Sequence, residues 1–317
     1  MSTCVVKSNN MIEWMSSLSE FSKILDIPLT QLAIPGSHNS GTFTLDAGER
    51  IAPGALPFVE TLASNPTIGP MAKAIIRGWA VCQTLNFRQQ LEAGVRYFDL
   101  RVARKPGTED LYLAHQLYGP KVTDVIETLC QFLKEHPHEI ILLDFNHFYG
   151  MDLEHHIQLV TYLISQFDSL ICHRCDTKNI TLQRMWEEKK QVVIFYQHGS
   201  VEDFEEIFTS ESISSPWPNT ADSTQCLQVL ETIHSRAQDE KFLVCQGVLT
   251  PTDGTIIAGM LCNLKIWSSS WTPLFNSWIQ TSKTNSRLNI VLADFIESDN
   301  LIQSIINLNF TRFDLKS

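Results

Sequence analysis

Basic residues are few in this sequence, and their scarcity limits what the protein binds. The 317 residues include 24 Lys and Arg against 35 Asp and Glu, so the formal net charge is −11. Proteins that bind nucleic acids use clustered Lys and Arg to neutralise phosphates, and no stretch of this chain is rich in either. Nucleic acid is therefore excluded as a partner. The same acidic balance gives no general attraction to an anionic membrane, so any contact with lipid must depend on local features.

Long apolar runs are also lacking. No run reaches the roughly eighteen apolar residues that a bilayer-spanning helix needs, so we expect no transmembrane segment. Residues 1–10 contain no apolar stretch typical of a secretory signal, and Ser2 stands where a myristoylated chain carries Gly. These features predict a cytoplasmic protein.

The eight cysteines are scattered, with no spacing typical of a disulfide framework. In a chain without a signal peptide they are expected to be reduced thiols. Cys172 and Cys175 form an isolated C-x-x-C pair. Without a second pair, this spacing favours an ordinary loop over a metal or redox site.

Strand-like and helix-like segments alternate along most of the chain. The short apolar segments predict strands at residues 32–34, 96–102, 111–115, 140–145, 192–196, 242–248 and 290–294, with a weaker one between 208 and 220. Apolar residues at three- and four-residue spacing predict helices at residues 86–93, 122–135, 153–167, 182–188, 223–237 and 300–307. Gly94 is expected to end the first of these helices in a left-handed conformation.

This alternation predicts an α/β protein with a single (β/α) TIM-type barrel, distorted or incomplete at the weak strand. We expect one domain over residues 1–317, with its core at about 28–312. A doubly wound open sheet is the alternative fold. It is disfavoured because no G-x-G-x-x-G follows the first strand.

Polar side chains follow the predicted strands at their carboxyl ends, where a barrel places its active site. They are His38 and Asn39, Asp99 and Arg101, His115, Asp144 and Asn146, Gln197 and His198, and Asp294. Because side chains alternate along a strand, Tyr97, Asp99 and Arg101 should share the inward face. An ion pair that only stabilises the barrel is the alternative reading of Asp99 and Arg101. We interpret His136, His138, His155 and His156 as solvated residues of helices and turns.

Three motifs carry a family resemblance. They are I-P-G-S-H-N-S at residues 34–40, G-V-R-Y-F-D-L-R at 94–101 and L-Y-L-A-H at 111–115. In this order and context, the chain resembles the phosphatidylinositol-specific phospholipases C. It is most similar to the small eukaryotic proteins that consist of the X domain. The segments L-D-F-N-H-F-Y-G-M at 143–151 and S-P-W-P-N-T at 215–220, which contains Trp217, are similar to that subgroup.

The resemblance implies cleavage of phosphatidylinositol to diacylglycerol and an inositol phosphate, cyclic or acyclic. His38 would be the general base, His115 the general acid, and Asp294 the partner of His38. Arg101 would neutralise charge on the phosphate, and Asp99 would position Arg101 or His115. Substrate contacts would fall to Asn39, Asp144, Asn146, Gln197 and Trp217. The protein would then act on phosphatidylinositol at a membrane surface, with which it would associate peripherally and transiently.

Two positions depart from the family pattern. Asn39 replaces the Asp of the bacterial enzymes, and Asn146 replaces both their Lys and the Glu of the calcium-dependent enzymes. We expect no metal and no calcium requirement, because Arg101 takes the place of a second inward carboxylate. A lipid-binding barrel with weak or no turnover and a metal-dependent, glycerophosphodiesterase-like enzyme are the alternatives.

An aromatic cluster precedes the last predicted strand. It consists of Trp267, Trp271, Leu274, Phe275 and Trp278. Such side chains favour a membrane interface, and packing between barrel and helix is the competing interpretation. The sequence leaves both open.

Overall fold

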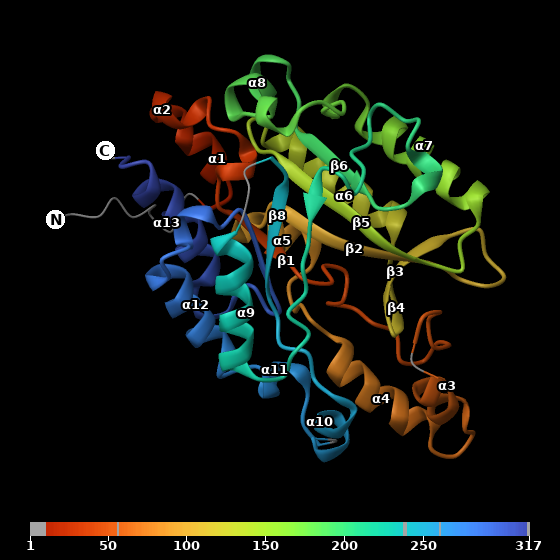
Figure 1. Ribbon diagram of the computed structural model, residues 1–317. Coiled ribbons are helices and arrows are strands. Elements are labelled where there is room, and N and C mark those ends of the chain that lie inside the picture. The colour runs from red at the N-terminus through yellow and green to blue at the C-terminus, as the bar shows by residue number, and fades with distance from the viewer. Residues whose placement is uncertain (1–10, 56, 237–239, 260, 316–317) are drawn as a thin grey trace.

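Parallel strands arranged around a common axis form the centre of the protein (Figure 1). The computed structural model describes residues 11–55, 57–236, 240–259 and 261–315. The strands are β1 (Ile34–Ser37), β2 (Tyr97–Arg104), β3 (Leu111–His115), β4 (Leu117–Lys121), β5 (Ile141–Tyr149), β6 (Val192–Tyr196), β7 (Ile213–Ser214), β8 (Phe242–Gly247) and β9 (Ile290–Ala293). The parallel pairs give the order β7-β8-β9-β1-β2-β5-β6. The first residues 1–10, on which the signal and acylation predictions rest, lie outside the described residues.

The ring closes through the segment that leads into β7. Phe208 makes a parallel bridge with Phe195 of β6. Five residues later, Ile213 pairs with Phe242 of β8. These short pairings are where the sequence predicts its weakest strand. The α/β barrel prediction is confirmed, and the irregularity lies at the expected place.

The third predicted strand has the opposite direction to the one expected. β3 is antiparallel to β2, with Val102 opposite Leu113, and turns back through Gln116 into β4. A parallel neighbour would need a helical crossover, and only about six residues separate β2 from β3. The prediction of β3 as a parallel barrel strand is therefore wrong, and β4 was not predicted at all. β5 instead pairs directly with β2.

Helices cover the outside of the ring (Figure 1). They are α1 (Trp14–Ser17), α2 (Ser22–Leu25), α3 (Pro57–Ser64), α4 (Gly69–Ala80), α5 (Phe87–Ala93), α6 (Val122–Glu135), α7 (Leu153–Phe167), α8 (Leu182–Glu187), α9 (Ser223–Ser235), α10 (Asp253–Ala258), α11 (Leu264–Trp267), α12 (Trp271–Thr281) and α13 (Leu301–Arg312). All six predicted helices are present, although the predicted end at residue 237 lies outside the described residues. Gly94 caps α5 with φ of 108°, as predicted. None of the helices described has the length and apolar character needed to cross a membrane.

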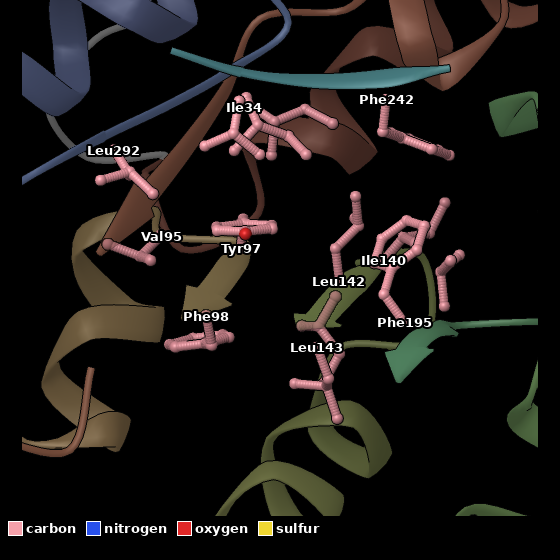
Figure 2. Close-up of a cluster of buried hydrophobic side chains, with 14 of the residues drawn as sticks. Ile34, Val95, Tyr97, Phe98, Ile140, Leu142, Leu143, Phe195, Phe242 and Leu292 are labelled. Carbon is pink, nitrogen blue, oxygen red and sulfur yellow. The ribbon is translucent and has the colours of Figure 1, made fainter. Parts of the chain in front are cut away.

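Buried apolar side chains from neighbouring strands form the core in and around the barrel (Figure 2). Gly36, Tyr97 and Leu292 lie at one level of neighbouring strands. A Cβ added to Gly36 would lie 2.8 Å from the Tyr97 ring, so the glycine makes room for the tyrosine. Leu142 stands at the same level on β5. The next inward layer towards the carboxyl ends of the strands is polar and contains Asp99 and Asp144.

Helix α12 contains most of the predicted aromatic cluster and packs it inward. Trp271 and Phe275 are buried, with ring centroids 5.4 Å apart. The indole of Trp271 donates to the carbonyl oxygen of Gly247 at 2.9 Å, and Phe275 occupies the space where a Cβ of Gly247 would lie. An interfacial role for Trp271 and Phe275 is therefore wrong, because both belong to the core. Leu274, the large apolar residue exposed on α12, is 50% exposed.

His155 and His156 were also misplaced by the sequence interpretation, since both are buried. The backbone N–H of His155 donates to Asp152 Oδ1 at 3.2 Å in the capping box of α7, and its Nδ1 lies 2.5 Å from the same oxygen. His156 contacts the Tyr196 hydroxyl at 2.7 Å and stacks on His198 with ring centroids 3.8 Å apart. His156 therefore links α7 to Tyr196 of β6 and Phe148 of β5, whereas His155 stabilises the start of α7. His138 is exposed and His136 partly so, as predicted.

Candidate active site

His38 and Asp294 meet because they follow neighbouring strands. β1 and β9 are parallel, with Ser37 opposite Ala293, so the residues after these two come out side by side. The Nδ1 atom of His38 lies 2.7 Å from Oδ1 of Asp294. A carboxylate beside Nδ1 favours the tautomer in which that nitrogen carries the proton.

The other ring nitrogen of His38 faces two groups that only donate. The side-chain amide nitrogen of Asn39 lies 3.1 Å from Nε2, and Nη2 of Arg101 lies 3.4 Å from it. A nitrogen surrounded by donors must itself be an acceptor. Neutral His38 therefore holds its proton on Nδ1 and presents a lone pair at Nε2, which is the form a general base needs.

Asp99 lies at the bottom of this site and holds three of its residues in place. Its Oδ2 accepts a hydrogen bond from the backbone N–H of Asn39 at 2.8 Å, and its Oδ1 accepts one from the Asn146 amide at 2.7 Å. Arg101 Nη2 lies 3.8 Å from Oδ2. Burial alone would raise the pKa of Asp99, but the charges of Arg101 and His38 and these hydrogen bonds outweigh it and lower that pKa. Asp99 is thus a fixed anion.

Arg101 is only partly engaged by the protein. Its contact with Asp99 is long, and its buried Nε has no hydrogen-bond partner in the described part of the chain. A purely structural ion pair would use more of the guanidinium, as Arg96 does with Glu139 at 2.8 Å in the interior. The unused donor of Arg101 is suited to an anionic group of a ligand.

Asp144 forms a second polar group one strand further along. It accepts hydrogen bonds from Tyr97 at 2.6 Å, Gln197 at 2.7 Å and Asn146 at 3.2 Å. Burial raises the pKa of Asp144 to about 6, although the three donors oppose this. The register of β5 shifts between Phe145 and His147, and the extra residue is Asn146. This bulge lets the Asn146 amide link Asp144 to Asp99.

His115 reaches the site from the antiparallel strand β3, with its ring centroid 6.4 Å from that of His38. Its Nδ1 lies 2.8 Å from the carbonyl oxygen of Ala80, at the end of α4. A carbonyl only accepts, so Nδ1 carries the proton and Nε2 is the free end of the ring. Burial, helped by the nearby charge of Arg101, lowers the pKa of His115 to about 4. In the resting protein His115 is therefore neutral at pH 7.

This low pKa gives a test that needs no substrate. In an NMR titration, the ring signals of His115 should keep their neutral position down to about pH 4. The unfolded state takes up a proton at this position near pH 6.5 and the folded state only near pH 4. His115 should therefore reduce the free energy of unfolding as the pH falls between those values, and His115→Ala should remove that part of the dependence. A midpoint near pH 6.5 for His115 would contradict the burial described here.

Two residues at the centre of the site were missed by the sequence analysis. Cys82 and Gln83 lie between α4 and α5. The Gln83 amide donates to the backbone oxygens of His38 and Ala293 at 2.8 and 2.9 Å, which ties the ends of β1 and β9 together. The Cys82 sulfur lies 3.5 Å from the Asn39 amide and 3.8 Å from Nδ1 of His115. Burial raises the pKa of the Cys82 thiol well above its usual range. No local sequence signal marks either residue, because their role depends on where the long segment after β1 returns.

Trp217, a predicted substrate contact, and His198, predicted at a strand end, lie apart from this cluster. Trp217 is 54% exposed and its indole donates to Thr250 at 3.0 Å. His198 stacks on His156 as described above. The structure therefore brings together His38, Asn39, Asp99, Arg101, His115 and Asp294, with Asp144, Asn146 and Gln197 beside them. Among the residues with described positions, Cys172 and Cys175 belong to no set of three potential metal ligands.

Relatives of known family extend over almost the whole chain. PI-PLC X domain-containing protein 3 of Homo sapiens is 36% identical over 305 residues, which cover 95% of this chain and 94% of the relative. PI-PLC X domain-containing protein 2 of Mus musculus is 38% identical over 302 residues, covering 94% of this chain and 87% of the relative. The chain belongs to the PI-PLC X domain-containing proteins. A scan against protein-family models finds no match.

Solved structures agree with the fold. Phosphatidylinositol-specific phospholipase C from Listeria monocytogenes superposes with a TM-score of 0.66 at 18% identity, covering 94% of this chain and 98% of the bacterial one. A phospholipase C of this kind from Staphylococcus aureus gives a TM-score of 0.67 at 18% identity over 95% of this chain. At this identity the likeness concerns the barrel alone. This member of the PI-PLC X domain family therefore has the same barrel fold as the bacterial enzymes. In its own structure, that barrel carries the antiparallel β2–β3 pair.

Proposed function

We propose that this chain is a phosphodiesterase that cleaves phosphatidylinositol by general acid–base catalysis. The observation that carries the proposal is the pairing of two imidazoles across one site. His38 presents an acceptor nitrogen next to Arg101, and the ring of His115 lies 6.4 Å away with its Nε2 end free. A phosphodiester held between them would have a base on one side, an acid on the other and a guanidinium beside its oxygens.

The first step forms a cyclic phosphate. The 2-hydroxyl oxygen of inositol attacks phosphorus, and Nε2 of His38 takes the hydroxyl proton. The bond from phosphorus to the glycerol oxygen breaks, and His115 gives that oxygen a proton, so that diacylglycerol leaves neutral. In the second step the two histidines exchange roles. His115 takes a proton from the water that attacks the cyclic 1,2-phosphate, and His38 returns one to the 2-oxygen of inositol. The anionic substrate would raise the low pKa of His115 and load it with the proton it must donate.

Asn39 has a place in this proton transfer. Its Oδ1 is buried and has no hydrogen-bond partner among the described residues, while its amide nitrogen faces His38 Nε2. Once Nε2 is protonated it becomes a donor, and the amide group must turn to present Oδ1 to it. Such a turn would satisfy the unpaired oxygen and stabilise the imidazolium. Asp294 would hold the positive charge on the opposite side of the ring.

The inositol ring would lie over the second polar group. Asp144, Asn146 and Gln197 present carboxylate and amide groups beside Asp99, and such groups pair well with sugar hydroxyls. Trp217 stands outside the cluster, so any contact it makes would be with the lipid or the outer face of the headgroup. A metal-dependent reaction is not favoured, because Arg101 already brings a positive charge to the place where a catalytic cation would contact the phosphate.

The same end of the molecule carries exposed apolar side chains suited to a lipid surface. Segments α3–α4 follow β1 and α10–α11 follow β8, so both lie at the carboxyl ends of the strands (Figure 1). Trp79 of α4 and Trp267 of α11 pack together with ring centroids 6.0 Å apart. We call the large apolar residues exposed on these segments the rim apolar residues: Leu62, Ile68, Met71, Ile257, Leu261 and Ile266. They replace Trp271 and Phe275 as the proposed membrane contacts.

Replacing Met71 and Leu261 together by Ser should weaken binding to phosphatidylinositol vesicles by about tenfold or more. The two side chains are 65% and 105% exposed, so their removal costs membrane contact rather than core packing. Vesicle sedimentation and thermal melting measure the two effects separately. Ile12→Ser, at the opposite end of the molecule, is the matched control. A loss of melting temperature without a loss of vesicle binding would contradict the assignment.

The proposed activity is tested with the purified chain and vesicles of phosphatidylinositol, followed by ³¹P NMR. Inositol 1,2-cyclic phosphate should appear first, with diacylglycerol in equal amount, and phosphatidylcholine vesicles should yield no phosphorylated headgroup. Binding to phosphatidylinositol vesicles without any product would instead support the non-enzymatic lipid-binding barrel.

A further inference from the structure

Cys82 lies at the centre of the site with a potential metal-binding atom, and the proposed reaction does not use it. Among the described residues, His38, Cys82 and Asp294 form a set whose potential metal-binding atoms all lie within 4.8 Å of one another. The imidazole and carboxylate are already 2.7 Å apart. His115 Nδ1 lies 3.8 Å from the Cys82 sulfur, and the Asn39 amide nitrogen lies 3.5 Å from it.

We propose that this cluster is an inhibitory site for a thiophilic divalent cation such as Zn²⁺, with His38, Cys82 and Asp294 as its ligands. One nitrogen, one sulfur and one oxygen are a donor set that zinc accepts in proteins. The thiolate selects against calcium and magnesium, which take oxygen ligands. The cluster is therefore distinct in chemistry from a calcium site.

The distances between the three ligand atoms must change modestly to hold a zinc ion. Zinc bonds of about 2.0–2.3 Å place two ligands of a tetrahedral ion about 3.3–3.8 Å apart. The cluster lies on both sides of that value, with one pair at 2.7 Å and the outer limit at 4.8 Å. Rotations of the His38 and Cys82 side chains would bring all three ligand atoms into this range. The fourth position would be taken by water or by His115.

A cation can reach the cluster from solvent. The side chains of His38 and Asp294 are 13% and 7% exposed, while Cys82 lies behind them. The ion would meet the imidazole and the carboxylate first and then displace the proton of the thiol. Thiolate and carboxylate together balance the charge of the ion. Asp99 balances that of Arg101, which would otherwise repel it.

The bound ion would stop the reaction whichever nitrogen of His38 coordinates it. An ion on Nε2 occupies the atom that takes the substrate proton. An ion on Nδ1 leaves the proton on Nε2, so that the same atom is no longer an acceptor. In both cases Asp294 is withdrawn from the imidazole. The inhibition rests on the proposed function, whereas the binding does not.

The binding is tested first, with Co²⁺ as the probe. Intact protein should develop the charge-transfer absorption of a cobalt–thiolate bond, and Zn²⁺ should displace it. Cys82→Ser should lose that band, and Cys130→Ser, which removes a half-buried thiol on α6, should keep it. Absence of the band in the parent protein, or its persistence in Cys82→Ser, would overturn the proposal even if the protein had no catalytic activity.

The inhibition is tested on phosphatidylinositol vesicles with added Zn²⁺. Cleavage should fall in the parent protein and in Cys130→Ser and recover when a chelator is added. Measured against its own rate without metal, Cys82→Ser should need at least about tenfold more Zn²⁺ for half inhibition. Equal sensitivity of Cys82→Ser and the parent would overturn the inhibitory role. Failure of the parent to cleave the lipid at all would refute the proposed function, and the cobalt spectrum would still decide the site.

Discussion

Replacing either His38 or His115 by Ala is expected to lower phosphatidylinositol cleavage by about 10²–10⁴-fold, the usual contribution of one acid or base group. Each imidazole has one nitrogen fixed by the protein, through Asp294 or Ala80, and its other nitrogen turned to the shared site. Their side chains contribute little to the apolar core, so both variants should remain folded. His173→Ala, at an exposed position, is the matched control for the loss of an imidazole.

The choice of leaving group separates the two roles. An acid is needed only when the departing oxygen is strongly basic, as in glycerol. A synthetic inositol phosphodiester with a nitrophenyl leaving group should therefore restore much of the activity of His115→Ala. His38→Ala should stay inactive, because the attacking 2-hydroxyl is unchanged. Equal rescue of both variants, or near-parent rates for either on phosphatidylinositol, would refute the assigned roles.

Local patterns predicted the elements of this fold well. The boundaries of α6, α7, β3 and β6 agree with the sequence analysis, because each combines a clear apolar period with a defined end. The direction of β3 was not predictable from its own residues. It depends on the short connection from β2, and a strand has the same alternation in either direction.

The position of His115 shows how a correct residue can rest on a wrong argument. The sequence analysis placed it at the site because parallel strands end on the same face of a barrel. The structure brings it there because the β2–β3 hairpin turns the chain back towards that face. Cys82 and Gln83 were missed for a related reason. Their neighbours come from β1, β3 and β9, and no short window of sequence contains these contacts.

Aromatic side chains were the least predictable part of the chain. Trp271 and Phe275 have the composition of a membrane interface, but Gly247 leaves a space on β8 that Phe275 fills. Only the tertiary structure reveals that match. The surroundings of Arg96 are likewise set by the tertiary structure, since its guanidinium is fully buried against Glu139 and backbone oxygens.

Cleavage of phosphatidylinositol is expected to proceed without calcium. Calcium requires about six to eight oxygen ligands, usually including several carboxylates. The carboxylates of this site already accept hydrogen bonds, Asp99 from Asn39 and Asn146, and Asp144 from Tyr97, Gln197 and Asn146. Rates in EGTA should equal those in millimolar calcium, or exceed them if trace zinc occupies the Cys82 cluster. Activity that disappears with EGTA and returns with calcium would contradict this expectation.

Arg101 is expected to supply the positive charge that a metal would otherwise provide. The fall in rate on replacing Arg101 should therefore be large and independent of calcium. Arg101→Ala should lower the rate by about 10²–10³-fold, as for removal of one donor to a developing oxyanion. Arg101→Lys keeps the charge but loses the planar fork that matches two phosphoryl oxygens, and it should recover only part of the activity. Arg104→Ala, at the end of the same strand, is the matched control, because Arg104 pairs with Glu109. The three variants are compared in EGTA and in calcium. Full activity of Arg101→Ala in EGTA would exclude Arg101 from the reaction, and a loss that calcium reverses would mean that a cation can take its place.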